Sequence, residues 1–195
     1  MNKQSLLYTV IFTFAICFVF VFILAAVNEA TIERVEQNRI VAQQRAILSA
    51  MGFSFETDDE ILSLFDDVET TEVDGRTYYE TTRDGRRILA SEFSGQGLWG
   101  TIRSVVAMEE GFEKIAGLEI IEHNETPGLG GRVTEREFRA QFLDLPVRED
   151  GISVVSNPTG ESEVEAITGA TQTSNSVERI VNSAIEIFRR SFADA

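Results

Sequence analysis

The strongest feature of the hydrophobic pattern is an N-terminal run without a charged residue, Leu6–Val27. A helix of this length spans roughly 33 Å, enough to cross a hydrocarbon core of about 30 Å. A cleaved signal peptide is the alternative, and Ala25, Ala26 and Ala30 are small residues of the kind found at cleavage sites. The apolar part of a signal peptide is shorter, however, at about 7–15 residues. The pattern therefore favours a transmembrane anchor over residues 1–27.

Helical spacing of apolar residues continues beyond this run. Residues 28–51 contain neither Pro nor Gly, and Gly52 is a plausible helix end. We expect a helical stalk over 28–51 and a single globular domain over 52–195. Shorter helices are predicted over Asp59–Phe65 and Glu135–Phe142.

Strands joined by tight turns are predicted for the first half of the domain. Asp74-Gly75 and Asp84-Gly85 each lie between strand-like flanks, a strong signal for a two-residue hairpin turn. The predicted strands are rich in Tyr, Thr, Ile, Val and Phe, and cover Thr77–Thr82, Arg87–Phe93, Thr101–Met108, Ile115–His123 and Ile152–Val155.

A final amphipathic helix is predicted over Asn175–Phe188. Its apolar residues recur at helical spacing and form one stripe: Val177, Ile180, Val181, Ala184, Ile185 and Phe188. Asn175 is a candidate N-cap, and Glu178 stands three positions later, as in a capping box. Antiparallel strands with flanking helices predict an α+β domain.

Charge and composition narrow the chemistry. Residues 28–195 hold 16 of the 17 Lys and Arg residues and all 32 Asp and Glu residues, a net charge of −16. Such a domain repels the phosphates of a nucleic acid. The only cysteine, Cys17, lies in the apolar run, and His123 is the only histidine. A disulfide framework and a multi-histidine metal centre are thereby excluded, so demanding chemistry would need a bound cofactor.

The first of three candidate stretches is Ser94–Gly100, which contains a literal GxGxxG. A dinucleotide fold requires a helix after this motif, whereas a β-branched segment follows here. The alternatives are a glycine-rich bend with Trp99 packed in the core, or a Trp99 ring that flanks a flat aromatic ligand.

The second stretch, His123–Gly131, is a loop in which several glycines permit close approach of the backbone. His123 and Glu125 stand two apart, so both point to one side if the chain is extended. They could form an acid/base pair or a hydrogen-bonded structural pair, and spacing alone favours the structural pair.

The third stretch, Ile167–Ser174, places Thr171 and Thr173 just before the final helix. A helix N-terminus suits a phosphate group, because its first N–H groups are unpaired and carry partial positive charge. A plain Ser or Thr helix cap is the alternative.

Together these stretches resemble one family over nearly the whole chain: the FMN-binding subunits of bacterial respiratory complexes. These are the C subunit of Na+-translocating NADH:quinone oxidoreductase and the related G subunit of the Rnf complex. Thr168-Gly169-Ala170-Thr171 matches the family's Ser/Thr-Gly-Ala-Thr flavinylation motif, and His123–Gly130 matches its HxETPGLG. Gly97-Leu98-Trp99 resembles a segment of the C subunits, and this favours the Na+-translocating type.

The resemblance implies FMN held through a phosphoester to Thr171, attached by a separate flavin transferase. It also implies an electron-transfer subunit with other membrane subunits as partners, and a flavin domain on the periplasmic face of the inner membrane. The Lys and Arg residues that flank the anchor do not decide that side. The residues expected to contact the cofactor are Trp99, Glu125, Thr126, Gly128, Leu129, Thr168, Gly169, Ala170 and Thr173.

The sequence departs from the family in two respects. Glu165 stands where the family commonly has Asp, six residues before the modified threonine, and the chain is shorter than typical C subunits. Two other functions remain open at this point: a stand-alone membrane-anchored FMN module of another reductase or sensor, and an anchored domain that binds no flavin.

Overall fold

The computed structural model describes residues 6–193, and the chain divides into two units, Met1–Ile40 and Val41–Ala195. Helix α1 (Leu6–Ala50) begins in the first unit and ends in the second. The compact second unit thus begins earlier than the predicted boundary at residue 52. The reason is that Ala46, Ile47 and Ala50 pack into one of its cores.

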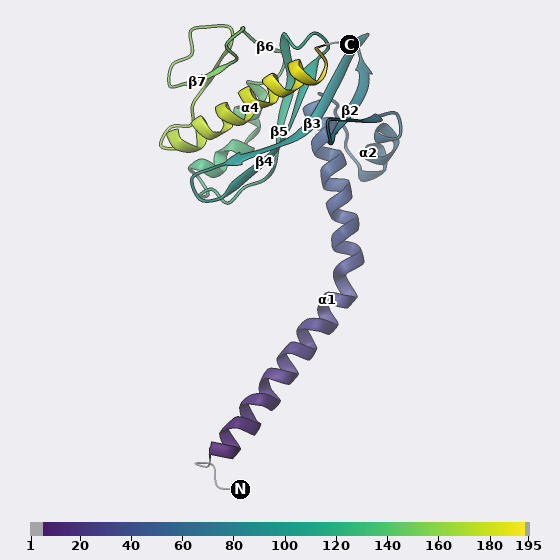
Figure 1. Ribbon diagram of the computed structural model, residues 1–195, viewed down its shortest axis with the longest axis vertical. Coiled ribbons are helices and arrows are strands. Elements are labelled where there is room, and N and C mark those ends of the chain that lie inside the picture. Colours follow the sequence, from purple (N-terminus) through teal and green to yellow (C-terminus); the bar gives the residue numbers. More distant parts are fainter. Residues whose placement is uncertain (1–5, 194–195) are drawn as a thin grey trace. The chain divides into compact units, whose positions relative to one another are not determined.

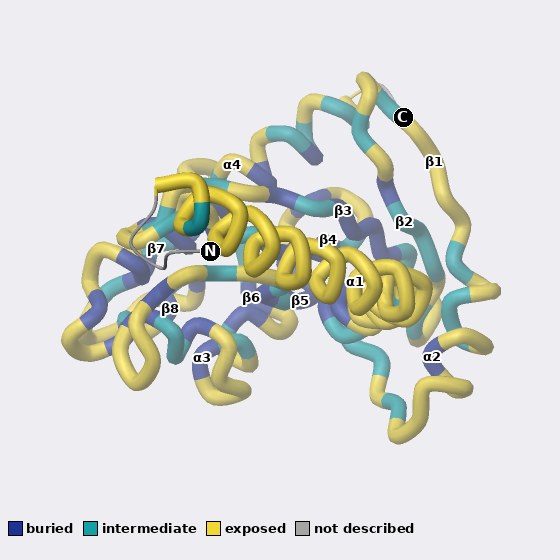
Figure 2. The backbone as a smooth tube through the Cα atoms, turned by 90° about the horizontal axis from the view of Figure 1, so that it is seen from below, coloured by how far each residue is buried: buried dark blue, intermediate teal, exposed yellow. Residues whose placement is uncertain are grey.

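The described part of the first unit, residues 6–40, is a single helix that is apolar up to Val27. Most of its described residues are exposed, as the tube of α1 shows (Figure 2). Among residues 6–193, α1 is the one helix long and apolar enough to cross a membrane. Its exposed surface is rich in Phe, Val, Ile and Leu, which water solvates poorly.

The second unit is built on a six-stranded antiparallel sheet in which the strands follow their order in the sequence (Figure 1). Its strands are β1 (Glu69–Val73), β2 (Arg76–Arg83), β3 (Arg86–Gln96), β4 (Thr101–Glu109), β5 (Lys114–Glu122) and β6 (Leu145–Pro146). The predicted turns are confirmed: Asp74 and Gly75 have φ of 53° and 74°, and Asp84 and Gly85 have 53° and 76°. Positive φ at both central residues matches the twist of the flanking strands.

Helix α4 (Thr171–Ser191) crosses one face of this sheet (Figure 1). The predicted apolar stripe is buried there along its whole length. The helix starts earlier than predicted, because the N–H of Ser174 already bonds to the carbonyl of Ala170 at 3.0 Å. Asn175 is therefore exposed within the helix rather than its cap, and the predicted capping box is wrong. Glu178 instead accepts a hydrogen bond from the N–H of Val154 at 2.5 Å.

The opposite face of the sheet packs on the end of α1, where Ile47 and Ala50 share a second buried cluster with Ile88 and Val105. Successive residues of β4 alternate between the two clusters, because neighbouring side chains of a strand point to opposite faces. Both faces of the sheet are thus covered by helices.

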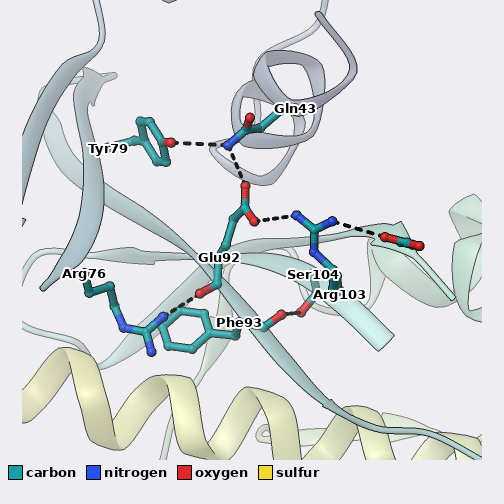
Figure 3. Close-up of polar contacts among 8 residues, drawn as sticks. Gln43, Arg76, Tyr79, Glu92, Phe93, Arg103 and Ser104 are labelled. Atoms are coloured by element: carbon teal, nitrogen blue, oxygen red, sulfur yellow. Dashed lines mark hydrogen bonds and ion pairs between the residues drawn. The ribbon is translucent and has the colours of Figure 1, made fainter. Parts of the chain in front are cut away.

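A polar network joins α1 to the sheet beside this cluster (Figure 3). The amide of Gln43 donates to the Glu92 carboxylate at 2.6 Å and to the Tyr79 hydroxyl at 3.4 Å. Arg103 holds the other oxygen of Glu92 at 3.0 Å. Burial, and then the Glu92 charge, raise the pKa of the Tyr79 hydroxyl. On β2, Arg76 stacks over the ring of Phe93 at 4.5 Å.

Short elements complete the domain. The predicted helices occur as α2 (Asp58–Phe65) and α3 (Arg136–Ala140), and a 3-10 helix, η1 (Gly130–Thr134), precedes α3. Strand β7 (Ser153–Val155) pairs in parallel with β8 (Glu163–Glu165), a pairing that the sequence did not predict. The predicted α+β class is confirmed.

Candidate functional site

The three candidate stretches meet at one end of α4. They are the turn between β3 and β4, the loop after β5, and the first turn of α4. Together they surround a hollow of about 460 Å³, within the range of about 300–1,000 Å³ that is usual for small-molecule and cofactor sites. Its lining residues are Leu98, Trp99, Glu125, Thr126, Leu129, Gly130, Gly169, Ala170, Thr171, Gln172 and Thr173.

The glycine-rich stretch is a turn between two antiparallel strands. The N–H of Gly97 donates to the carbonyl of Gly100 at 2.7 Å, and β4 follows directly. The helix that a dinucleotide fold needs is replaced by a strand, which excludes that alternative. Trp99 is 67% exposed, which excludes the alternative that it packs in the core. Its ring and the side chain of the half-exposed Leu98 instead form an apolar platform at the hollow.

The loop after β5 contributes a buried carboxylate. Glu125 is 4% exposed and accepts hydrogen bonds from the backbone N–H groups of Leu98 at 2.9 Å and Trp99 at 3.0 Å. Its second oxygen accepts a hydrogen bond from the hydroxyl of Thr173. Glu125 thus lies against the hollow, but both of its oxygens are used within the protein.

His123 and Glu125 are linked through the backbone of the loop. The N–H of Glu125 donates to Nδ1 of His123 at 3.1 Å. Among the described residues the two side chains share no hydrogen bond. The observed contact is that of the structural alternative, in which His123 shapes the loop through the backbone of Glu125.

The start of α4 is open. Its N-cap is Ala170, which makes no side-chain capping bond, and the first turn contains no acidic side chain. The unpaired N–H groups and the positive end of the helix dipole therefore have no counter-charge from this turn. Thr171 is the first helical residue, and its side chain is exposed. Within residues 6–193 its hydroxyl makes no hydrogen bond, and Thr171 lines the hollow.

Two predicted contact residues lie outside the hollow. Gly128 is exposed at the loop turn with a φ of 75°, and Thr168 lines a separate hollow of about 340 Å³ that also contains Glu165. There the backbone N–H of Glu165 donates to the side-chain amide oxygen of Gln141 at 2.7 Å. Sequence reasoning missed Leu98, Gly130 and Gln172, although all three stand within or beside the motifs that it identified.

Comparison with known proteins shows which proteins this chain resembles. Residues 97–186 match the family model of the FMN-binding domain. A solved structure of the C subunit of the Na+-translocating NADH-quinone reductase from Parabacteroides distasonis has the same fold. It has a TM-score of 0.71 and 19% identity, and the match covers 82% of this chain and 95% of that chain.

Residues 97–186, which contain the lining of the hollow, thus resemble the FMN-binding domain family. The protein is a relative of two kinds of subunit, and the resemblance predicted from its sequence is confirmed. It is 36% identical over 90 residues to the G subunit of the ion-translocating oxidoreductase complex of Methanosarcina acetivorans, covering 46% of this chain and 45% of the relative. It is 40% identical over 91 residues to the C subunit of the Na+-translocating NADH-quinone reductase of Vibrio anguillarum, covering 43% of this chain and 36% of the relative. The matches thus cover less than half of either relative.

Proposed function

We propose that this protein is the membrane-anchored electron-transfer subunit of an ion-translocating oxidoreductase complex, with FMN esterified through its phosphate to Thr171. One observation carries the proposal: the exposed hydroxyl of Thr171, which makes no hydrogen bond within the described residues, stands at an uncapped helix start. This helix start lies beside an apolar hollow, in a segment that matches the FMN-binding family. FMN, when bound, supplies the redox chemistry, and the protein supplies attachment, position and environment.

The residues present fit both ends of FMN. The free N–H groups at the start of α4 suit a phosphate attached to Thr171, and no charged side chain of that turn competes for them. Leu98, Trp99 and Leu129 are half-exposed or more and all line the hollow. They offer apolar surface to a flat ring, and covering them removes their exposed area from water.

The proposed partners follow from the relatives. Both relatives are named as subunits of ion-translocating complexes or reductases, so other membrane subunits would give electrons to this FMN and take them from it. A flavin transferase would form the phosphoester during maturation. We favour the Na+-translocating NADH:quinone type, because Gly97-Leu98-Trp99, which resembles the segment of the C subunits, forms the platform of the site.

The electron-transfer role is tested in membranes of the native host. The absorbance of this flavin is isolated as the difference between wild-type membranes and membranes that carry Thr171→Ala. We expect NADH to reduce this flavin within the time of a few turnovers, and a quinone to reoxidise it. A flavin that stays oxidised while NADH reduces quinone would contradict the role. Reduction by ferredoxin but not by NADH would contradict the Na+-translocating type.

The proposed location is the inner membrane, with the compact unit on the periplasmic side. Ser156 is exposed beyond β7, so Ser156→Cys places a thiol on the domain surface. In a Cys17→Ser background, we expect a membrane-impermeant maleimide to label this thiol in intact cells. The background without Ser156→Cys is the control and should stay unlabelled. Labelling only after the inner membrane is permeabilised would place the domain in the cytoplasm.

A further inference from the structure

The carboxylate of Glu125, in the loop after β5, connects this loop with two other parts of the site. One oxygen accepts from the N–H groups of Leu98 and Trp99 in the β3–β4 turn, and the other accepts from the hydroxyl of Thr173 in α4. A buried carboxylate costs free energy unless donors satisfy it, and hydrogen bonds to a charged acceptor are stronger than neutral ones. Each of its donors lies in an element that lines the hollow.

The backbone around this carboxylate is shaped to admit it. A Cβ atom on Gly97 would come within 2.5 Å of Oε1 of Glu125, and a Cβ on Gly130 would come within 2.7 Å of Oε2. Side chains at either position would push the carboxylate away, because real contacts of this kind are not so short. Two glycines from different loops thus keep the space that the carboxylate occupies.

The hydrogen bonds of Glu125 connect the first turn of α4, which contains the proposed attachment point Thr171, with the Leu98–Trp99 platform. Thr173 follows Thr171 by two positions in the first turn of α4, and Trp99 is at the other end of this connection. We propose that Glu125 is a positioning residue, which sets the placement of the Leu98–Trp99 platform relative to Thr171. This inference rests on the proposed function. It assigns to Glu125 a role through the protein rather than through contact with the flavin.

Conservative substitutions separate position from charge. In Glu125→Gln the amide oxygen can accept from both N–H groups, while the NH₂ group donates to the Thr173 hydroxyl, so the geometry stays and the charge is lost. In Glu125→Asp the charge stays, but the side chain is shorter by one methylene. Its carboxylate therefore does not reach the donors of the β3–β4 turn and of α4 together. Glu125→Ala removes every bond. A positioning role predicts that the Glu125→Gln variant holds the platform as the wild type does. It also predicts that Glu125→Asp loosens the platform as Glu125→Ala does.

The first measurement is hydrogen exchange on the full chain in detergent, purified without flavin. We expect the Leu98 and Trp99 amides to exchange roughly tenfold faster or more in Glu125→Asp and Glu125→Ala, and within a few-fold of wild type in Glu125→Gln. If Glu125→Ala does not fold, the Asp and Gln variants suffice. Because no flavin is needed, this readout holds even if Thr171 carries none.

The second measurement is visible circular dichroism of the flavin-loaded chain, whose band reports how firmly the ring is held. We expect the band to weaken in Glu125→Asp and to persist in Glu125→Gln, at equal flavin content by mass. The matched control is Asn182→Ala, which removes two bonds at 2.9 Å between α4 and Ile152, away from the hollow. It should leave the Leu98 and Trp99 amides and the flavin band unchanged.

Three results would overturn the proposal. The first is unchanged exchange of both amides in Glu125→Asp. The second is a Gln variant that resembles Ala while Asp resembles wild type, which would show that the charge itself acts. The third is an equal effect of Asn182→Ala, which would show general loosening of the domain. Absence of flavin from the wild-type chain would instead contradict the proposed function, and the exchange measurement would still decide the role of Glu125.

Discussion

Thr171→Ala is expected to abolish covalent attachment of FMN. Alanine has no hydroxyl, so no phosphoester can form at the start of α4, and the neighbouring hydroxyl of Thr173 is buried and bonded to Glu125. After co-expression with an active flavin transferase, wild-type protein should keep yellow fluorescence on a denaturing gel. The variant should run as a colourless band of equal amount.

The matched control is Thr171→Ser, which keeps the hydroxyl and removes one methyl group. It should retain covalent flavin, because the reacting oxygen is unchanged. Flavin fluorescence that persists in Thr171→Ala would place the attachment elsewhere in the chain. If the wild-type chain stays colourless while the same transferase flavinylates a second substrate, the proposed covalent attachment is contradicted. Glu165→Asp then tests whether the longer acid blocks the transferase.

Phe188→Ala is expected to destabilise the compact unit by about 3–5 kcal/mol. The side chain of Phe188 is 0% exposed and lies among the rings of Tyr78, Phe93 and Phe112, at centroid distances of 5.5, 5.6 and 5.7 Å. Its removal loses the burial of a large apolar side chain and the ring contacts, and leaves a cavity between α4 and the sheet. Denaturant unfolding, followed by far-ultraviolet circular dichroism, measures the change.

Leu62→Ala serves as the control for Phe188→Ala. Leu62 lies in α2 and is 45% exposed, so its truncation should change the free energy of unfolding by less than about 1 kcal/mol. Equal losses for the two variants would mean that the cluster between α4 and the sheet does not dominate the stability of the unit.

Much of the fold could be predicted from local signals. Asp-Gly pairs specify the two hairpins because only a few residue types accept positive φ at both central turn positions. The stripe from Val177 to Phe188 identifies the buried face of α4, because packing on a sheet needs apolar residues at helical spacing. The long apolar run likewise identifies the first part of α1.

Features that depend on tertiary contacts could not be predicted. Asn175 is a better N-cap than Ala170 by residue type, yet α4 starts at Thr171. The earlier start leaves the helix uncapped, and this opens it to an anion. The hydrogen bond from the Trp99 N–H to the Glu125 carboxylate joins two loops that lie far apart in the sequence, so no local signal predicts it. Pairing of β7 with β8 is parallel, so the two strands do not form a hairpin that local turn signals could identify.

Attachment of FMN to Thr171 is tested by peptide mapping of the wild-type chain purified from native membranes. Tandem mass spectrometry of the peptide that contains Thr168, Thr171 and Thr173 locates any modification at a single residue. We expect a gain of one FMN minus one water on Thr171. Unmodified Thr171, with the gain on another residue or with flavin released intact on denaturation, would contradict it.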